Sequence, residues 1–186
     1  MANRNTQGFG LIAAGTLGST PATSGQGKYK IDANYATTIF NGGAVASAAG
    51  YIVEGQGTDT PILGVLNGIF YNAATTLKPT FANHYVQVTP ANSEDIDAFV
   101  FDNPQQQYVV ATDDAVAQAG YLETYDMNTS AGSTTTGQSS ATLDIGDTSA
   151  DAASWRLLRS AEDPENDENA AFRSVVVVAN LIELQN

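Results

Sequence analysis

Hydrophobic and polar positions alternate along the segment from Tyr29 to Val45. The even positions begin with Lys28, Lys30, Asp32 and Asn34, whereas the odd positions are Tyr29, Ile31, Ala33, Tyr35, Thr37 and Ile39. Because successive side chains of a β-strand point to opposite faces, this period of two predicts a half-buried strand. The segment ends in Asn41-Gly42-Gly43, residues that accept positive φ, so we expect a chain reversal there.

Short β-like runs continue through the rest of the chain. They are Tyr51–Val53, Ile62–Tyr71, Thr80–Val88, Ile96–Asp102, Tyr108–Ala111, Ala141–Ile145, Trp155–Ala161 and Phe172–Leu184. The fourth and fifth runs flank Asn103-Pro104, which predicts a hairpin. The acidic residues 162–169 are expected at the tip of a second hairpin. Four consecutive valines, residues 175–178, predict a central strand buried on both faces, or one buried between the body and a partner.

Residues 112–120 have the pattern of a helix. Thr112 or Asp113 is a suitable N-cap, acidic residues suit the first turn, and Gly120 follows the last turn. We therefore expect one short helix of about two turns, held by tertiary packing. The strand-like runs predict a mainly β fold, a compact β-barrel or β-sandwich of about 8–10 short strands.

The first 28 residues differ from the rest because glycine recurs in them too often for regular structure. They also carry four apolar side chains, Phe9, Leu11, Ile12 and Leu17. One interpretation is a solvated chain end, and the other is an extended arm that docks these side chains on a neighbouring subunit. We divide the chain into an N-terminal arm, residues 1–28, and a single β-barrel or β-sandwich domain, residues 29–186. Lys28 and Lys30, at the junction, complete the set of candidate partner contacts.

Composition disfavours several classes of function. The chain has 186 residues, of which 20 are acidic and 7 basic, so its net charge is −13. Binding to nucleic acid or to an anionic membrane is not expected, because both need clustered lysine and arginine. The absence of cysteine excludes disulfides and thiolate chemistry. The first residues lack the charged and long apolar regions of a signal peptide, so we expect a protein made in the cytoplasm.

Side chains that carry chemistry are sparse. His84 is the single histidine, and no Gly-x-Ser-x-Gly motif supplies a nucleophile beside it, so we interpret it as a packed or surface residue. One histidine without cysteine cannot complete a tetrahedral zinc site. Carboxylates cluster at residues 94–97, 144–151 and 162–168, and none of these clusters follows the calcium-loop pattern. We expect no catalytic, cofactor-binding or metal-binding residues, and no enzyme.

Three strings between residues 20 and 42 are distinctive in combination: Thr20–Thr23, Tyr29–Asp32 and Tyr35–Gly42. They resemble a family of small head structural proteins from tailed bacteriophages, of the marine and cyanobacterial phage type. The similarity continues through Ile62–Val65, Phe70-Tyr71, Lys78–Phe81 and Ile96–Pro104, and is looser beyond residue 104. The chain departs from the family pattern at Gly43-Ala44, where an acidic or bulky residue is more frequent.

The resemblance implies a capsid decoration (cement) protein. Such a protein is made in the host bacterial cytoplasm, binds the major capsid protein on the outer capsid surface of the virion, and stabilises the shell by bridging capsid subunits. Neighbouring copies of the chain, as dimers or trimers, are a further implied partner. The alternative is a host-attachment or glycan-binding module of a head fibre or tail accessory. Neither role implies nucleic acid, a membrane or a cofactor.

Overall fold

A computed structural model describes residues 3, 5–18, 25–55, 60–129, 132–146 and 153–185. Strands make up 45% of the structure and helical segments 5%, which confirms the prediction of a mainly β fold. The strands form two antiparallel sheets that are not closed into a barrel, so a β-sandwich is the alternative that fits. The helical segments among the described residues are three short 3₁₀ turns, η1 (Ala91–Ser93), η2 (Gln118–Gly120) and η3 (Glu183–Gln185).

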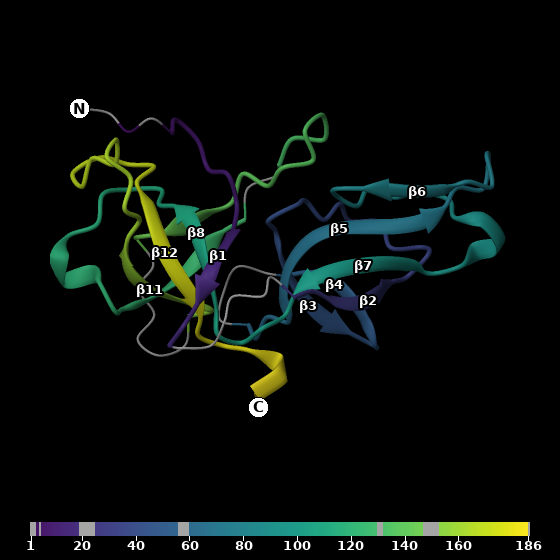
Figure 1. Cartoon of the computed structure of the whole chain (residues 1–186), viewed down its shortest axis with the longest axis horizontal. Coiled ribbons are helices and arrows are strands. Elements are labelled where there is room, and N and C mark those ends of the chain that lie inside the picture. Colours follow the sequence, from purple (N-terminus) through teal and green to yellow (C-terminus); the bar gives the residue numbers. More distant parts are fainter. Residues whose placement is uncertain are drawn as a thin grey trace.

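The first sheet has six strands, and Figure 1 shows it in one half of an elongated molecule. In spatial order they are β1 (Ile12–Thr16), β8 (Gln106–Ala111), β12 (Ser174–Ala179), β11 (Trp155–Ser160), β9 (Thr124–Asn128) and β10 (Thr142–Asp144). The valine strand β12 lies between β8 and β11 and is buried along its first five residues. This confirms the prediction of a central strand, and its pairing with β11 confirms the hairpin with the acidic tip.

The second sheet occupies the other half of the molecule (Figure 1). Its path is β2 (Gly27–Ile31), β7 (Ile96–Phe101), β5 (Gly64–Asn72), β3 (Ala44–Ala48) and β4 (Tyr51–Glu54), and β6 (Pro79–Ala82) also pairs with β5. The two ends of this path, β2 and β4, lie close to each other, so the sheet curls around its own apolar core. In chain order, the entire second sheet is inserted between β1 and β8, which pair with each other.

Each sheet has its own hydrophobic cluster. The cluster of the second sheet contains Ile31, Ile69 and Ile96, which are almost completely buried. The cluster of the first sheet is centred on Trp155, whose ring meets that of Tyr108 edge to face at 5.7 Å between centroids. Segments of the second sheet also reach this cluster, and the two halves are joined by bridges between Asn41 and Gln138 and between Ile62 and Ile182. The halves therefore share an apolar junction.

The predicted hairpin around Asn103-Pro104 is wrong. The two strands that it joins belong to different sheets: β7 pairs with β2 and β5, whereas β8 pairs with β1 and β12. The residues between them form the crossing from the second sheet back to the first. The turn signal was correct about the end of each strand, but a turn signal does not specify the partner of a strand.

The predicted strand from Tyr29 onward stops at Ile31. The carboxylate of Asp32 accepts a hydrogen bond from the backbone NH of Asn34 at 2.7 Å, and this side-chain turn competes with strand pairing. Ile39 is still buried, and it bridges Tyr85 on a distant segment. The reversal after it is confirmed, because Gly42 has φ = 76° and the NH of Gly43 bonds to the carbonyl of Phe40.

The predicted helix at residues 112–120 is also wrong, apart from η2 at its end. The residues that were expected to cap this helix form hydrogen bonds to distant segments instead. The backbone NH of Thr112 donates to Arg173, the NH of Asp113 donates to Leu143, and the Asp113 carboxylate accepts from the NH of Ile145 at 2.9 Å. Because these groups are bonded across the sheet, they cannot start a helix.

In the described part of the predicted arm, residues 3 and 5–18 pack on the chain's own body and do not extend away from it, and residues 25–28 lead into β2. β1 pairs with β8, and Leu11 is only 3% exposed within the core of the first sheet. The side chain of Asn3 donates to the carbonyls of Asp167, Ala170 and Ala171 at 2.8–3.2 Å, and its oxygen accepts from the NH of Asp167. The arm boundary at residue 28 falls inside β2, and residues 19–24 lie outside the described residues.

The start of β5 gives a test of the fold through paired glycine substitutions. A Cβ atom on Gly64 would lie 2.2 Å from the carbonyl oxygen of Phe101, whereas one on Gly15 in β1 would meet no atom within 4 Å. We expect Gly64→Ala to lower the free energy of unfolding in urea by about 2–3 kcal/mol because of this overpacking. Gly15→Ala should change it by less than about 1 kcal/mol. Equal stability of the two variants would contradict the pairing of β5 with β7.

Candidate functional site

Six side chains share the outer face of the second sheet, away from its core. Register places Lys28 opposite Phe99, Lys30 opposite Asp97, Asp97 opposite Phe70, and Phe70 opposite Phe81. Directly opposed residues of antiparallel strands point to the same side of the sheet. We call this set the phenylalanine–lysine face; it consists of Lys28, Lys30, Phe70, Phe81, Asp97 and Phe99.

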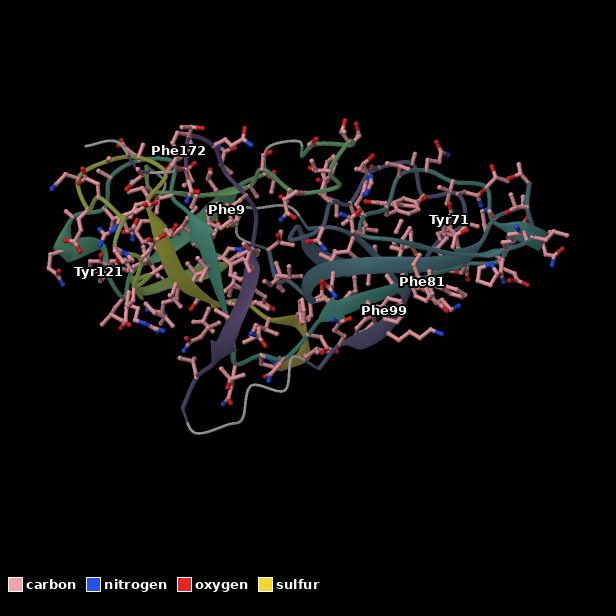
Figure 2. All side chains as sticks on the ribbon, turned by 45° about the horizontal axis from the view of Figure 1, so that its top comes forward. Phe9, Tyr71, Phe81, Phe99, Tyr121 and Phe172 are labelled. Atoms are coloured by element: carbon pink, nitrogen blue, oxygen red, sulfur yellow. The ribbon has the colours of Figure 1, made fainter. Side chains whose placement is uncertain are left out.

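The three phenylalanine rings of this face form one continuous cluster, in which Phe81 is exposed and Phe70 and Phe99 are half-buried. Phe81 stands between the other two, with centroids 4.7 Å from Phe70 and 6.5 Å from Phe99. Phe81 is 73% exposed, the highest value among the large hydrophobic side chains of the described residues. Figure 2 shows Phe81 and Phe99 close together on one side of the sheet. A cluster of this kind on a surface marks a contact site more often than a scattered apolar residue does.

A hollow of about 460 Å³ lies beside the rings of Phe81 and Phe99. The polar residues in its lining are Gln26, Asn67 and Asn83, each of which has a side-chain amide. It lies next to a β-bulge, since the register of β5 against β7 shifts between Leu66 and Gly68. Rings and amides together can contact both the apolar and the polar groups of a partner.

The charged groups of the face are arranged around one carboxylate. The ammonium groups of Lys28 and Lys30 lie 2.7 Å and 2.6 Å from the carboxylate oxygens of Asp97, whose side chain is only 13% exposed. Burial alone raises the pKa of Asp97, but the hydrogen bonds from the two lysines outweigh burial and lower it below its ordinary value. Two cations against one anion leave the face with a local positive charge on a chain of net charge −13.

The structure separates the predicted contact residues into two groups. Lys28 and Lys30 lie together on the phenylalanine–lysine face. Phe9, Leu11, Ile12 and Leu17 lie along β1 and its flanks, where Leu11 is buried, Phe9 and Leu17 are half-buried, and Ile12 is exposed. The three phenylalanines were not among the predicted contact residues. The sequence did contain a sign that Phe99 faces outward, because Phe99 falls on the polar side of the alternation formed by Ile96, Ala98 and Val100.

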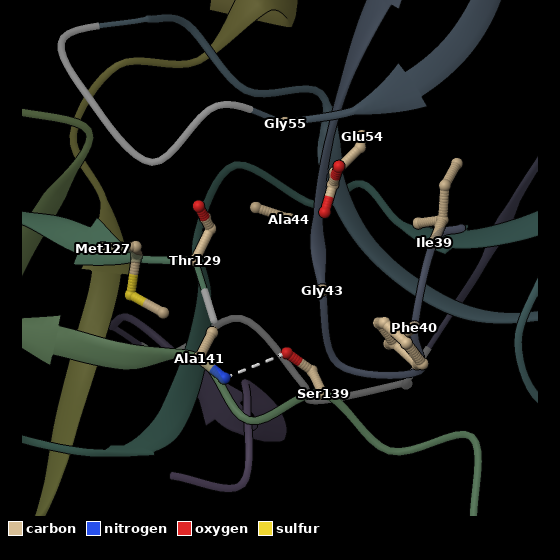
Figure 3. A pocket seen from close by; sticks show the side chains of 10 residues that line it. All are labelled: Ile39, Phe40, Gly43, Ala44, Glu54, Gly55, Met127, Thr129, Ser139 and Ala141. Atoms are coloured by element: carbon tan, nitrogen blue, oxygen red, sulfur yellow. Dashed lines mark hydrogen bonds between the residues drawn. The ribbon is translucent and has the colours of Figure 1, made fainter. Parts of the chain in front are cut away.

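The junction of the two halves contains a narrow pocket, shown in Figure 3. Its walls include Phe40 and Glu54 from one half and Met127 and Ser139 from the other. Its volume of about 20 Å³ has room for roughly one water molecule. Ser139 Oγ accepts a hydrogen bond from the NH of Ala141, and burial raises the pKa of Glu54. Among the described residues, no hydrogen bond joins the Ser139 hydroxyl to the Glu54 carboxylate.

The other candidate chemical groups are dispersed. The ring of His84 stacks on Phe40 at 6.0 Å between centroids and its Nδ1 contacts Asn83, with no hydroxyl bonded to it among the described residues. Asp95 accepts a hydrogen bond from Tyr51, and Glu168 forms an ion pair with the buried Arg173. Asp147 and Asp151 lie outside the described residues. Within the described part of the chain, no group of three or more histidine, aspartate or glutamate side chains is placed to hold a metal ion.

A search for membrane-spanning helices among the described residues found none of sufficient length and hydrophobicity. Comparisons with known proteins also gave no match: no protein-family model, no curated protein and no solved structure is significantly similar to this chain.

The lysine–aspartate cluster predicts a pH-dependent stability difference. Since the pKa of Asp97 is lowered on folding, its contribution is complete above the unfolded pKa of about 3.9 and is lost as the pH falls through the folded pKa. We expect Asp97→Asn to be about 0.5–1 kcal/mol less stable than wild type at pH 7, because both lysines are half-exposed. This difference should shrink below about pH 4, as measured by urea unfolding. Glu123→Gln, at an exposed carboxylate, should show no such trend.

Proposed function

We propose that this chain is a capsid decoration protein that binds the outer surface of a phage capsid through the phenylalanine–lysine face and stabilises the shell by bridging subunits of the major capsid protein. The observation that carries the proposal is the cluster of Phe70, Phe81 and Phe99 on the outer face of a sheet, with Phe81 73% exposed at its centre. Such a cluster has no role in the chain's own core, which lies on the other side of the sheet. The resemblance to phage head proteins supplies the identity of the partner.

The energetics of the face suit a protein that acts in many copies. Each Å² of apolar surface removed from water contributes about 25 cal/mol, so a few phenylalanine rings give a modest contact. Repetition over a shell, and contact with more than one subunit, multiplies that modest free energy. Neighbouring copies, as dimers or trimers, would align several faces on one capsomer. The chain is made in the cytoplasm of the host bacterium and acts on the virion.

A glycan-binding module of a head fibre or tail accessory is the second candidate. The observation that favours it is the hollow beside Phe81 and Phe99. Sugars stack on exposed rings and exchange hydrogen bonds with amides, and Gln26 and Asn67 carry side-chain amides with no hydrogen bond to any other described residue. This candidate requires few copies per virion, whereas decoration requires many.

The position of the protein in a virion density map separates the two candidates. We expect density on the outside of the head at regular positions, with a copy number close to that of the capsomers. Density confined to the tail or to a fibre, with retention of sugars on a glycan array, would overturn the decoration role. A location inside the head would overturn both candidates.

The proposal makes a quantitative prediction for Phe81. Replacing a central aromatic contact typically costs at least about 2 kcal/mol of binding free energy, so Phe81→Ser should weaken binding to purified heads that lack the protein by about 30-fold. Binding is measured by co-sedimentation with the heads. Leu122→Ser is the matched control, because Leu122 is 62% exposed but belongs to the other half of the molecule. Equal effects of the two changes would exclude the phenylalanine–lysine face as the docking surface.

A further inference from the structure

A second hollow of about 500 Å³ opens between the hairpin of β3 and β4 and the C-terminal turn η3. Its walls include Tyr29, Tyr51, Ile52, Leu63, Glu183 and Leu184. Figure 1 shows the C-terminal turn close to this edge of the second sheet. Tyr29 alternates along β2 with Lys28 and Lys30, so this hollow opens on the opposite side of the strand from the phenylalanine–lysine face.

Glu183 supplies the one charged group in the described lining of this hollow, and the lining contains no lysine or arginine. Glu183 is part of the wall, and its position is fixed because one of its oxygens accepts a hydrogen bond from the NH of Ser47 at 2.8 Å. Both tyrosines donate to a further carboxylate behind the wall, Tyr29 to Asp102 at 2.7 Å and Tyr51 to Asp95 at 3.2 Å. The rings therefore lie in a region of negative potential.

The tyrosine hydroxyls respond to this potential. Burial raises the pKa of Tyr29 to about 12, together with the hydrogen bond to Asp102 and the repulsion of Asp102 and Glu183. The pKa of Tyr51 is raised by its hydrogen bond to Asp95, and the charges of Asp95 and Asp32 add to that effect. A group that enters this hollow with a positive charge would relieve the repulsion that these carboxylates exert on one another.

We propose that the hollow binds a lysine or arginine side chain of the protein partner. The charged end would pair with the free oxygen of Glu183 and lie against the faces of Tyr29 and Tyr51, while the aliphatic stem would pack on Leu63 and Leu184. The inference rests on the proposed function only for the identity of the partner, the capsid surface. The carboxylate of Glu183 in the hollow and a basic side chain of the partner are complementary in charge, whereas the same carboxylate would repel an anionic ligand.

Two contact sites on opposite sides of one sheet also suit a bridging protein. The phenylalanine–lysine face offers apolar area and a weak positive charge, whereas this hollow offers an anionic, partly aromatic cavity. Two sites that differ in charge and direction would contact two different capsid surfaces, and each would reject the partner of the other.

The test is an NMR titration of the whole protein with Nα-acetyl-L-argininamide, and with Nα-acetyl-L-citrullinamide as a neutral ligand of nearly the same shape; they are called argininamide and citrullinamide below. We expect argininamide to shift the backbone amide signals of Tyr51, Ile52 and Leu184 with a Kd of about 1 mM, a value suited to so small a ligand. Citrullinamide should bind at least about fivefold more weakly. Equal binding of the two would overturn the cation site in favour of a neutral ligand, and no shift with either would overturn it outright.

Three variants test whether argininamide binds in this hollow. Glu183→Gln keeps the acceptor for Ser47 but removes the charge, and it should raise the Kd for argininamide at least about threefold. Tyr51→Leu, which keeps an apolar side chain, should do the same by removing a ring. Glu94→Gln is the control, because Glu94 is exposed in the same half of the molecule and does not line the hollow. If Glu94→Gln raised the Kd as much as Glu183→Gln does, argininamide would be attracted by the overall negative charge of the protein and not by this hollow, and the proposal would be overturned.

Argininamide binding and head binding, measured on the same variants, distinguish a failure of the cation site from a failure of the proposed function. Phe81→Ser should leave argininamide binding unchanged, whereas Glu183→Gln should weaken binding to heads by at least about threefold in 50 mM salt and less in 300 mM salt. If argininamide binds as expected but Glu183→Gln leaves head binding unchanged, the capsid is excluded as the source of the side chain. If the protein does not bind heads at all, the proposed function fails while the cation site stands on the titration alone.

Discussion

The pairing of β1 with β8 is the constraint on which the rest of the structure depends. It joins residues 12–16 to residues 106–109, and every strand of the second sheet lies between them in the chain. The side-chain amide of Gln106 bonds to the carbonyl of Gly15 at 2.7 Å, and the NH of Leu17 bonds to Gln105, so both ends of the insertion are tied together at its base. Closing so long a loop is costly in entropy, which predicts slow folding of the first sheet.

Local patterns located the strands well and their partners poorly. Alternation and turn residues identified most of the strand-forming runs, because a strand that is buried on one face has hydrophobic and polar residues at alternate neighbouring positions. The sheet to which each strand belongs depends on contacts about a hundred residues away, which no local window contains. The separation of β7 from β8 and the docking of Leu11 on its own core are both results of such contacts. The failed helix at residues 112–120 has the same cause, since Asp113 bonds to a distant segment.

The candidate site could be predicted only in part. Lys28 and Lys30 were singled out as partner contacts, and they lie on the surface that carries the exposed rings. The phenylalanines themselves were not among the predicted contacts, because an aromatic residue in a strand is usually buried. The position of Phe99 on the polar side of β7 indicated that its ring faces outward. That it shares a face with Asp97 and both lysines could be known only from the pairing of β2 with β7. All three lysines of the chain lie on or next to the second sheet.

The contact of Asn3 with the acidic loop has a consequence for how the chain tolerates change. One side chain at the beginning of the sequence satisfies three carbonyls and one NH of residues 167–171. This loop carries a concentration of carboxylates and is held on its other side by the buried Arg173 through Glu168. A substitution of Asn3 would therefore act at a distance, because it would leave the backbone groups of this charged loop without their side-chain partner. Asn3 thus anchors the acidic hairpin tip, although more than 160 residues separate them in the chain.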